Sequence, residues 1–426
     1  MASAIPAPDG ERETHTTVKE SRGEREREVL SPKSGWHRVV SHLPVPSVLS
    51  GDAIHNLTHY KYTGIDLSLV SRHLLQPIWT WQAQHVMDRV PWLSPNGVTL
   101  IELRWVDGIH ARRTHTCSCL GQLFDHGVDS LAVTVFMTTL LLLIRCPPLD
   151  SVLGVPVPWA VLIAGVAGAT FVAYQAEEFL CHVLKLDIVS FPVEGILLAG
   201  ALCLYMSVRH TSHYTSTLPA LSYLLANIPM LIGVGATLAL WFLTYTGAKG
   251  GMKALEDRQR ERDGETVPGT PGIERSGASS GPVTPHGMSH KVYAYTVYAE
   301  SLLVPLVLTG AAWYWSVTNP AYVYAPVLYT SAMGVALAEC AIRCTVARLT
   351  GVVHPATVTV SVSPLIPFTV VPLVSRHLGL SGMAEIHLSL ATALVCFAVY
   401  FVGCVALPIS RTLDLPLIAM RRQKQE

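Results

Sequence analysis

Charged residues are scarce in this chain of 426 residues, since Asp, Glu, Lys and Arg together make up only 14%. Soluble domains carry about a quarter of charged residues, so this shortage excludes an ordinary soluble fold. Thirty basic residues balance thirty acidic ones, which gives no reason to expect a nucleic-acid partner. Because half of the residues are hydrophobic, we expect an all-α, polytopic integral membrane protein, a bundle of about eight transmembrane helices.

Cysteine is also sparse, and its nine residues are scattered, mostly within apolar stretches. This pattern excludes a disulfide framework and favours small buried side chains. Residues 1–35 have few large apolar groups and are rich in Glu, Arg, Ser and Pro, a composition typical of disorder. They also lack the apolar core of a signal peptide, so we expect the N terminus to stay in the cytosol.

Long apolar runs, in contrast, are abundant. The stretches that predict membrane spans lie near 128–144, 155–176, 190–207, 219–245, 291–315, 321–343, 356–374 and 385–407. Lys and Arg concentrate in the loops on one side, for example at Lys249, Arg258 and Arg348, and the positive-inside rule makes that side cytosolic. An even number of spans then places both termini in the cytosol.

A polar stretch just before these spans breaks the apolar pattern. It holds two groups of residues at helical spacing: Asp107, Gly108, Ala111 and Arg112, then Gly121, Asp125 and Asp129. Residues three or four apart share a helix face, so each group predicts a short polar row. Carboxylates at the edge of a bilayer are costly unless they bind something. Two facing rows suit hard divalent cations, and two such ions can assist a phosphoryl transfer.

The spacing D-G-x2-A-R-x8-G-x3-D-x3-D, from Asp107 to Asp129, resembles the motif of the CDP-alcohol phosphatidyltransferase family. The strings DGIHARR and LGQLFDHGVDS are similar to those of its eukaryotic choline/ethanolamine phosphotransferase branch. This resemblance implies transfer of phosphocholine or phosphoethanolamine from CDP-choline or CDP-ethanolamine to diacylglycerol, with release of CMP, in phospholipid synthesis. It also implies a membrane protein of the endoplasmic reticulum, or Golgi, whose active site faces the cytosol.

The resemblance also implies roles for single residues. It gives a two-metal site for Mg²⁺ or Mn²⁺ to Asp107, Asp125 and Asp129, and substrate binding to Asn96, Gly108, Ala111, Arg112 and Gly121. Glycine permits close approach of the nucleotide and of the facing helix, and the planar arginine fork suits a phosphate. Asp129 is the family's usual general base. His126 has a pKa nearer neutrality and is the alternative.

A second polar string, from Gln175 to Gly195, resembles another string of the same branch and lies on the same side of the membrane. It contains Glu177, Glu178 and His182. Glu194 opens a span, where it could act in the catalytic cavity or serve only as an acid at a helix N terminus; both interpretations stay open. Later acids inside spans, such as Glu339, are expected to form interhelical hydrogen bonds.

In front of the motif the chain departs from the family pattern. Pro95, Asn96 and Thr99 resemble the element that begins the family's first span, whereas the Asp-Gly motif ends the second span. Only the eight residues from Val98 to Trp105 separate the two here, and each span needs about 20. We therefore expect two spans to be missing, since the branch has ten. Arg104 also stands where the family has another Asp.

Two explanations of this gap remain open. One is a gene-model or splice artefact over a normal enzyme, which we favour because all seven motif residues persist. The other is an inactive paralogue or truncated form. A transporter is a remote third interpretation, which predicts internal repeats and polar residues at mid-span, and neither is clear in the sequence. The oligomeric state stays open, with a homodimer among the alternatives.

Composition and motifs together predict six regions. They are a disordered cytosolic N terminus (1–35), a region with an interfacial amphipathic helix near Leu74–Val90 (36–94), the catalytic region (95–245), a flexible cytosolic loop (246–290), C-terminal transmembrane helices (291–408) and a basic cytosolic tail (409–426). The site residues predicted above, Glu194 included, all lie in the catalytic region.

Overall fold

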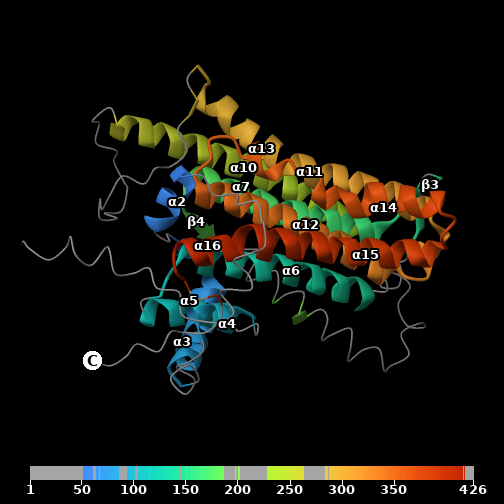
Figure 1. The fold of residues 1–426 in the computed structure, drawn as a ribbon, viewed down its shortest axis with the longest axis horizontal. Coiled ribbons are helices and arrows are strands. Elements are labelled where there is room, and N and C mark those ends of the chain that lie inside the picture. The colour runs from blue at the N-terminus through green and yellow to red at the C-terminus, as the bar shows by residue number, and fades with distance from the viewer. Residues whose placement is uncertain are drawn as a thin grey trace, which may run out of the picture. The chain divides into compact units, whose positions relative to one another are not determined.

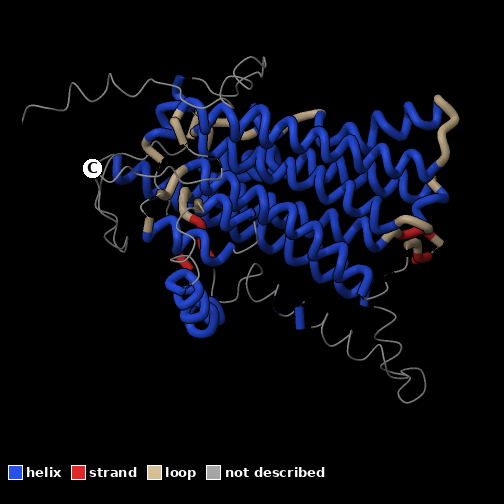
Figure 2. Tube along the Cα trace, turned by 60° about the horizontal axis from the view of Figure 1, so that its bottom comes forward, coloured by secondary structure: helices blue, strands red, loops and turns tan. Residues whose placement is uncertain are grey.

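The computed structural model describes residues 51–60, 64–66, 68–85, 94–100, 104–114, 116–143, 146, 148–152, 154–186, 197, 200–201, 228–262, 284–285, 287–415 and 417. All of them belong to one unit, residues 47–426. Helices dominate this unit, and its long helices run side by side (Figures 1 and 2).

The bundle is organised around one central helix. The long helices are α6 (Cys119–Leu143), α7 (Trp159–Cys181), α10 (Ile228–Arg262), α11 (His290–Thr318), α12 (Pro326–Thr350) and α15 (Gly382–Ala398), the last continuing through the π-helix η6 (Val399–Ala406) into α16 (Leu407–Thr412). Helix α12 contacts α6, α7, α11 and α15, and its side chains from Ala332 to Thr350 are all buried. Many of these are Ala, Gly, Cys or Thr, which let neighbouring helices approach closely.

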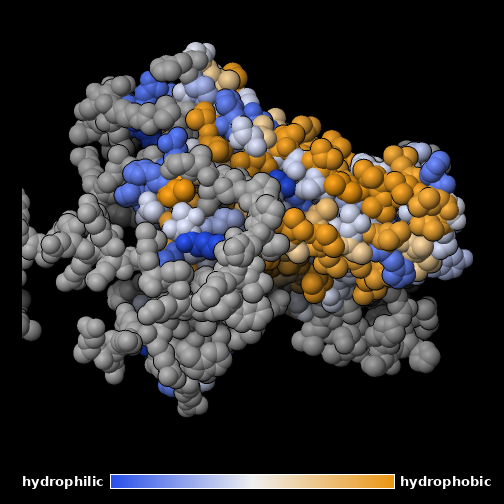
Figure 3. Space-filling model, in the orientation of Figure 1, coloured by the Kyte–Doolittle hydropathy of each residue, from blue (hydrophilic) through white to orange (hydrophobic). Residues whose placement is uncertain are grey.

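Among the described residues, four helices are long and apolar enough to cross a bilayer: α7, α11, α12 and the continuous run Gly382–Thr412. They coincide with four of the predicted spans and confirm a polytopic, helical membrane protein. Helix α6 includes residues 128–143 of the predicted span 128–144, and α10 includes residues 228–245 of the predicted span 219–245. Residues 144 and 219–227 and most of 190–207 lie outside the described residues. Figure 3 shows apolar side chains over the visible face of the long helices, as expected of a surface in lipid.

The segment predicted as a span at 356–374 is not one continuous helix. It consists of α13 (Ala356–Thr359), the 3-10 helix η5 (Ser363–Leu365) and α14 (Ile366–His377). Pro364 and Pro367 interrupt the backbone hydrogen bonding here, and the 12 residues of α14 reach only about 18 Å of the roughly 30 Å of a bilayer core. All three pieces contact α11, so this segment follows that helix in broken form.

Residues 246–262, predicted as the beginning of a flexible loop, are helical, because α10 continues to Arg262. Two interactions with α7 stabilise the extension: Leu255 is buried in a cluster with Leu180, and the Arg258 guanidinium donates to the Leu180 carbonyl at 2.6 Å. The sequence MKALEDRQRER is also made of good helix formers. Residues 263–283 of the predicted loop lie outside the described residues.

Short elements surround the beginning of α6. They are α2 (Gly51–Thr58), the π-helix η1 (Ser71–Leu75), α3 (Gln76–His85), α4 (Pro95–Leu100), α5 (Arg104–Arg113) and the strand β1 (Gly64–Asp66), which pairs in parallel with β4 (Leu184–Leu186). Elsewhere in the chain lie the hairpin of β2 (Asp150–Val152) and β3 (Val155–Val157) and the 3-10 helix η4 (Pro320–Val323). Leu74, Ile78 and Trp81 are all at least 47% exposed, consistent with the predicted interfacial helix. Residues 86–90 of that helix lie outside the described residues.

Candidate active site

A pocket of about 110 Å³ lies where α4, α5 and the start of α6 meet. Figure 1 shows these elements next to one another, and α4 contacts both of the other two. The predicted site residues that line the pocket are Asn96, Asp107, Gly108, Ala111, Arg112, Gly121 and Asp125; Thr99, Ser118 and Gln122 are among its other lining residues. The structure therefore brings together seven of the ten residues predicted to form the site.

Helices α4 and α5 hold the first carboxylate in place. The Thr99 hydroxyl donates to Asp107 Oδ2, and the Gly108 backbone N–H donates to Asp107 Oδ1 at 2.6 Å. Asn96 is tied to the C-terminal segment, because its Nδ2 donates to the Leu417 carbonyl at 2.9 Å. Asp107 is only 8% exposed, so its orientation is fixed by protein contacts.

Helix α6 begins beside α4 and carries the second part of the motif. Ser118 caps it, since its Oγ accepts from the Gly121 backbone N–H at 3.0 Å. A Cβ added at Gly121 would make only ordinary contact with Ser118 Oγ and Asn96 Oδ1, at 3.4 and 3.5 Å. At Gly108 an added Cβ would make only ordinary contact with the Arg112 guanidinium. The protein's own packing thus does not require glycine there.

Two other residues predicted to be catalytic, Asp129 and His126, do not line this pocket. Asp129 is half-buried one helical turn beyond Asp125. His126 is 5% exposed, and its Nδ1 lies 2.9 Å from Gln175 Oε1 on α7. Glu194 lies outside the described residues.

The donor set fits a hard divalent cation in kind. Asp107 and Asp125 contribute carboxylate oxygens and Asn96 an amide oxygen, and all three residues line the same pocket. No three Asp, Glu, His or Cys side chains in the described part of the chain lie close enough to enclose an ion. Mg²⁺ is commonly held by one or two carboxylates together with water and substrate phosphates, and this pocket offers that arrangement.

His182, which the sequence placed in the second polar string, ends α7 with a left-handed backbone (φ 54°). Burial, together with the charges of Arg258 and Arg348, lowers the pKa of its imidazole from 6.5 to about 3. The ring is therefore neutral at physiological pH. Because the unfolded chain binds this proton and the folded chain does not, His182 reduces stability as the pH falls below 6.5.

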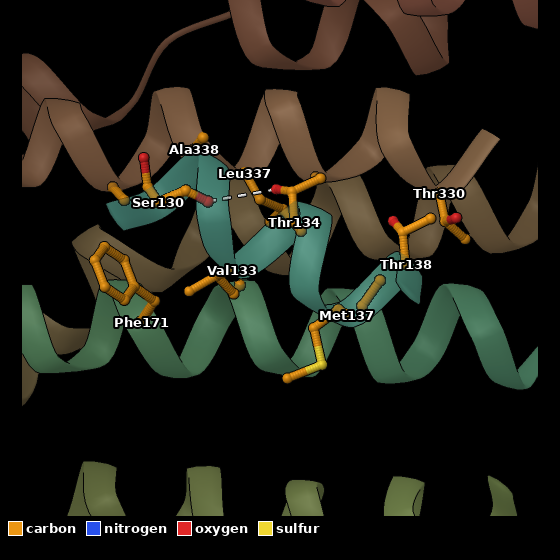
Figure 4. Close-up of a pocket in the computed structure, with 13 residues that line it drawn as sticks. Ser130, Val133, Thr134, Met137, Thr138, Phe171, Thr330, Leu337 and Ala338 are labelled. Carbon is orange, nitrogen blue, oxygen red and sulfur yellow. Dashed lines mark hydrogen bonds between the residues drawn. The ribbon is translucent and has the colours of Figure 1, made fainter. Parts of the chain in front are cut away.

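A second cavity lies deeper in the bundle, beyond the motif, between α6, α7 and α12 (Figure 4). Its volume of about 20 Å³ has room for about one water molecule. The lining is apolar apart from hydroxyls such as those of Ser130 and Thr134, and the Thr134 hydroxyl donates to the Ser130 carbonyl at 3.4 Å. Its size excludes a substrate site.

Sequence reasoning did not identify Gln122 and Arg348 as residues near the site. Gln122 lines the pocket and Arg348 is 8% exposed, and both contact Glu178. For Gln122 the available signal was its place within the LGQLFDHG string, three residues before Asp125. For Arg348 the only available signal was a single charged residue near the end of an apolar span.

Comparisons with known proteins agree with this geometry. The family model described as CDP-alcohol phosphatidyltransferase matches residues 101–244. An uncharacterized CDP-alcohol phosphatidyltransferase class-I family protein of Schizosaccharomyces pombe is 30% identical over 211 residues, which cover 40% of this chain and 52% of that protein. Choline/ethanolaminephosphotransferase 1 of Saccharomyces cerevisiae is 30% identical over 185 residues, 34% of this chain and 44% of the yeast protein.

A longer alignment includes the later helices. Cholinephosphotransferase 1 of Xenopus laevis is 23% identical over 354 residues, which cover 74% of this chain and 77% of that protein. The chain spans about half the length of the two fungal relatives. The matched segment contains the whole motif from Asp107 to Asp129, whereas the pocket residues Tyr60, Pro95, Asn96 and Thr99 lie before it. Residues 101–244 thus carry the similarity of this chain to the CDP-alcohol phosphatidyltransferase family, and they hold the motif residues that line the pocket.

Proposed function

We propose that this protein transfers phosphocholine or phosphoethanolamine from a CDP-alcohol to diacylglycerol and releases CMP. The observation that carries the proposal is the gathering of the motif residues around one open pocket, with Asp107 and Asp125 contributed by two different helices. Relatives named for choline and ethanolamine phosphotransfer support the substrate class.

In this reaction the chain's own residues bind and orient the donor. Asp107 and Asp125 would hold Mg²⁺ or Mn²⁺ together with the diphosphate, and a bound cation supplies charge neutralisation for the departing CMP. Arg112, exposed at the pocket, is suited to a phosphate oxygen through its planar fork. Gly108 leaves room for the nucleotide, since packing within the protein does not require glycine there.

For the general base the contacts favour Asp129 over His126. The His126 imidazole is directed at Gln175 and Thr345, away from the pocket. Asp129 follows Asp125 by one turn on α6, so it shares the motif face of that helix. A carboxylate there is suited to accept the proton of the diacylglycerol hydroxyl at the membrane face. Asp129 would also serve as a third cation ligand, and Glu194 stays a further candidate.

We place the pocket on the cytosolic side of the endoplasmic reticulum or Golgi membrane. The pocket end of the bundle is also the end where α7 and the basic extension of α10 meet, through Leu180 and Arg258. A glycosylation acceptor inserted at Ala278, between α10 and α11, should therefore remain unmodified because the enzyme that glycosylates works in the lumen. The same acceptor inserted next to Gly379, between α14 and α15, is the matched lumenal control. Modification at Ala278 would contradict this orientation.

Cation dependence tests the function itself. CDP-alcohol binding to the purified chain should be lost in EDTA and return with Mg²⁺ or Mn²⁺, because two carboxylates alone cannot attract a diphosphate. Equilibrium dialysis with labelled CDP-choline, and in parallel CDP-ethanolamine, measures this. Binding that persists in EDTA, or that fails with both nucleotides and both cations, would argue against the proposed site. A transporter of another solute would show no such nucleotide-dependent cation binding.

A further inference from the structure

A buried polar cluster lies directly behind the pocket and joins three helices. Glu178 on α7 is 2% exposed, and its Oε1 accepts from Gln122 Nε2 on α6 at 2.9 Å. The same oxygen lies 3.3 Å from Nη1 of Arg348 on α12. Because Gln122 also lines the pocket, Glu178 is one side chain removed from the candidate cation site.

A second layer repeats the arrangement one turn further along the same helices. His126 Nδ1 on α6 lies 2.9 Å from Gln175 Oε1 on α7, and the Thr345 hydroxyl on α12 donates to that oxygen at 3.0 Å. The two layers are linked, since His126 Nδ1 is 3.9 Å from Glu178 Oε2. Two points one turn apart on α6 are therefore held against the same two neighbours, which fixes the rotation of α6 about its axis.

That rotation determines where Asp125 points. Successive residues of a helix are separated by about 100°, so Asp125 lies between the directions of Gly121 and Gln122, both of which line the pocket. We propose that Glu178 is a positioning residue for the cation site: by holding Gln122 and Arg348, it keeps Asp125 directed at Asp107. This inference rests on the proposed function.

Stability alone does not explain the cluster. In a second buried pair on α12, Glu339 and Arg343, the arginine is fully engaged, because Arg343 also donates to Ser363 Oγ and the Val358 carbonyl and stacks on the Tyr400 ring, although Glu339 Oε2 makes no hydrogen bond with described residues. In contrast, Arg348 Nε and Nη2 are buried and make no hydrogen bond with described residues. An incompletely satisfied buried network stabilises a fold less than apolar packing does. Its place behind the pocket gives it a role that the Glu339 pair lacks.

The test measures cation affinity directly. The full 426-residue chain in detergent is titrated with Mn²⁺ in the presence of CDP-choline, and in parallel CDP-ethanolamine, and free Mn²⁺ is followed by electron paramagnetic resonance. Glu178→Ala should raise the half-saturating Mn²⁺ concentration about tenfold or more, the size typical of residues that orient metal ligands. Glu178→Gln keeps an oxygen for Gln122 and Arg348, so it should restore most of the affinity. Glu339→Ala is the matched control, since it removes a buried, arginine-paired carboxylate away from the pocket and should change the value less than about twofold.

The outcomes separate this inference from the proposed function. If the unmodified chain binds no Mn²⁺ with either nucleotide, both are wrong. If it binds Mn²⁺ and Asp125→Ala abolishes binding, while Glu178→Ala matches Glu339→Ala, only the positioning role is wrong. Should Glu178→Ala fail to fold, Glu178→Asp decides, because its shorter side chain draws the carboxylate back from Gln122. A several-fold weaker affinity than in Glu339→Asp, at a similar melting temperature, supports the role, and equal affinities overturn it.

Discussion

Asp125→Ala and Asp129→Ala should each reduce transfer from the CDP-alcohol to diacylglycerol by about 10³-fold, which corresponds to about 4 kcal/mol of lost stabilisation. Asp125 lines the same pocket as Asp107, and Asp129 follows Asp125 by one turn on α6. Each substitution removes a carboxylate that we propose holds the cation or accepts the proton, and alanine supplies no substitute. The assay uses membranes that contain a form of the protein with two further spans inserted before Asp107. It measures the transfer of the label from CDP-choline or CDP-ethanolamine into phospholipid.

A matched control separates loss of the site from general damage. Asp150→Ala removes an exposed carboxylate in β2, between the far ends of α6 and α7, where it accepts from Trp159 Nε1. It should leave transfer within about twofold, as is usual for surface substitutions distant from a site. Transfer by Asp125→Ala at the level of the Asp150→Ala control would remove Asp125 from the site, and the same result for Asp129→Ala would remove that residue.

The pocket was predictable because helical periodicity is a local property. The spacing of Asp107 to Arg112 and of Gly121 to Asp125 fixes which side chains share a face, and the structure places both groups around one pocket. The direction of His126 was not predictable in this way. It depends on Gln175 and Thr345, which are 49 and 219 residues away in the chain, and such contacts leave no trace in local spacing.

The same distinction explains the corrections to the fold. Average hydropathy predicted that the segment 356–374 spans the membrane, but the helix is interrupted at η5, at and just after which Pro364 and Pro367 lie. Charge identified residues 246–262 as solvated, yet Leu255 and Arg258 pack on the end of α7 and extend α10. Hydropathy reports the solvent that a segment prefers, whereas these two features depend on backbone hydrogen bonds and on specific partners.

The gap before Asp107 leads to the prediction with the largest effect. Helices α4 and α5 have 6 and 10 residues, so they reach about 9 and 15 Å and neither can cross a bilayer. They nevertheless pack together, and the Thr99 hydroxyl still donates to Asp107. This is expected if two antiparallel spans are removed, because the start of the first and the end of the second lie on the same membrane face. The donor pocket can therefore persist while one wall of the cavity is missing.

We expect the 426-residue chain to bind the CDP-alcohol weakly and to turn it over at least about 100-fold more slowly than a form with two further spans, because a site open to water or lipid loses preorganised charge stabilisation. Arg104 lies one turn before Asp107 on α5, where its charge repels a cation that the family's Asp would bind. Arg104→Asp alone should not restore turnover, since the wall stays absent. Turnover should return when two apolar helices of about 20 residues each are inserted between Leu100 and Asp107 so that the second ends in D-x-x-D-G. The matched control carries the same two helices with the ending R-x-x-D-G, and it should restore little turnover. Robust turnover by the purified 426-residue chain would show that neither the missing wall nor Arg104 limits the enzyme.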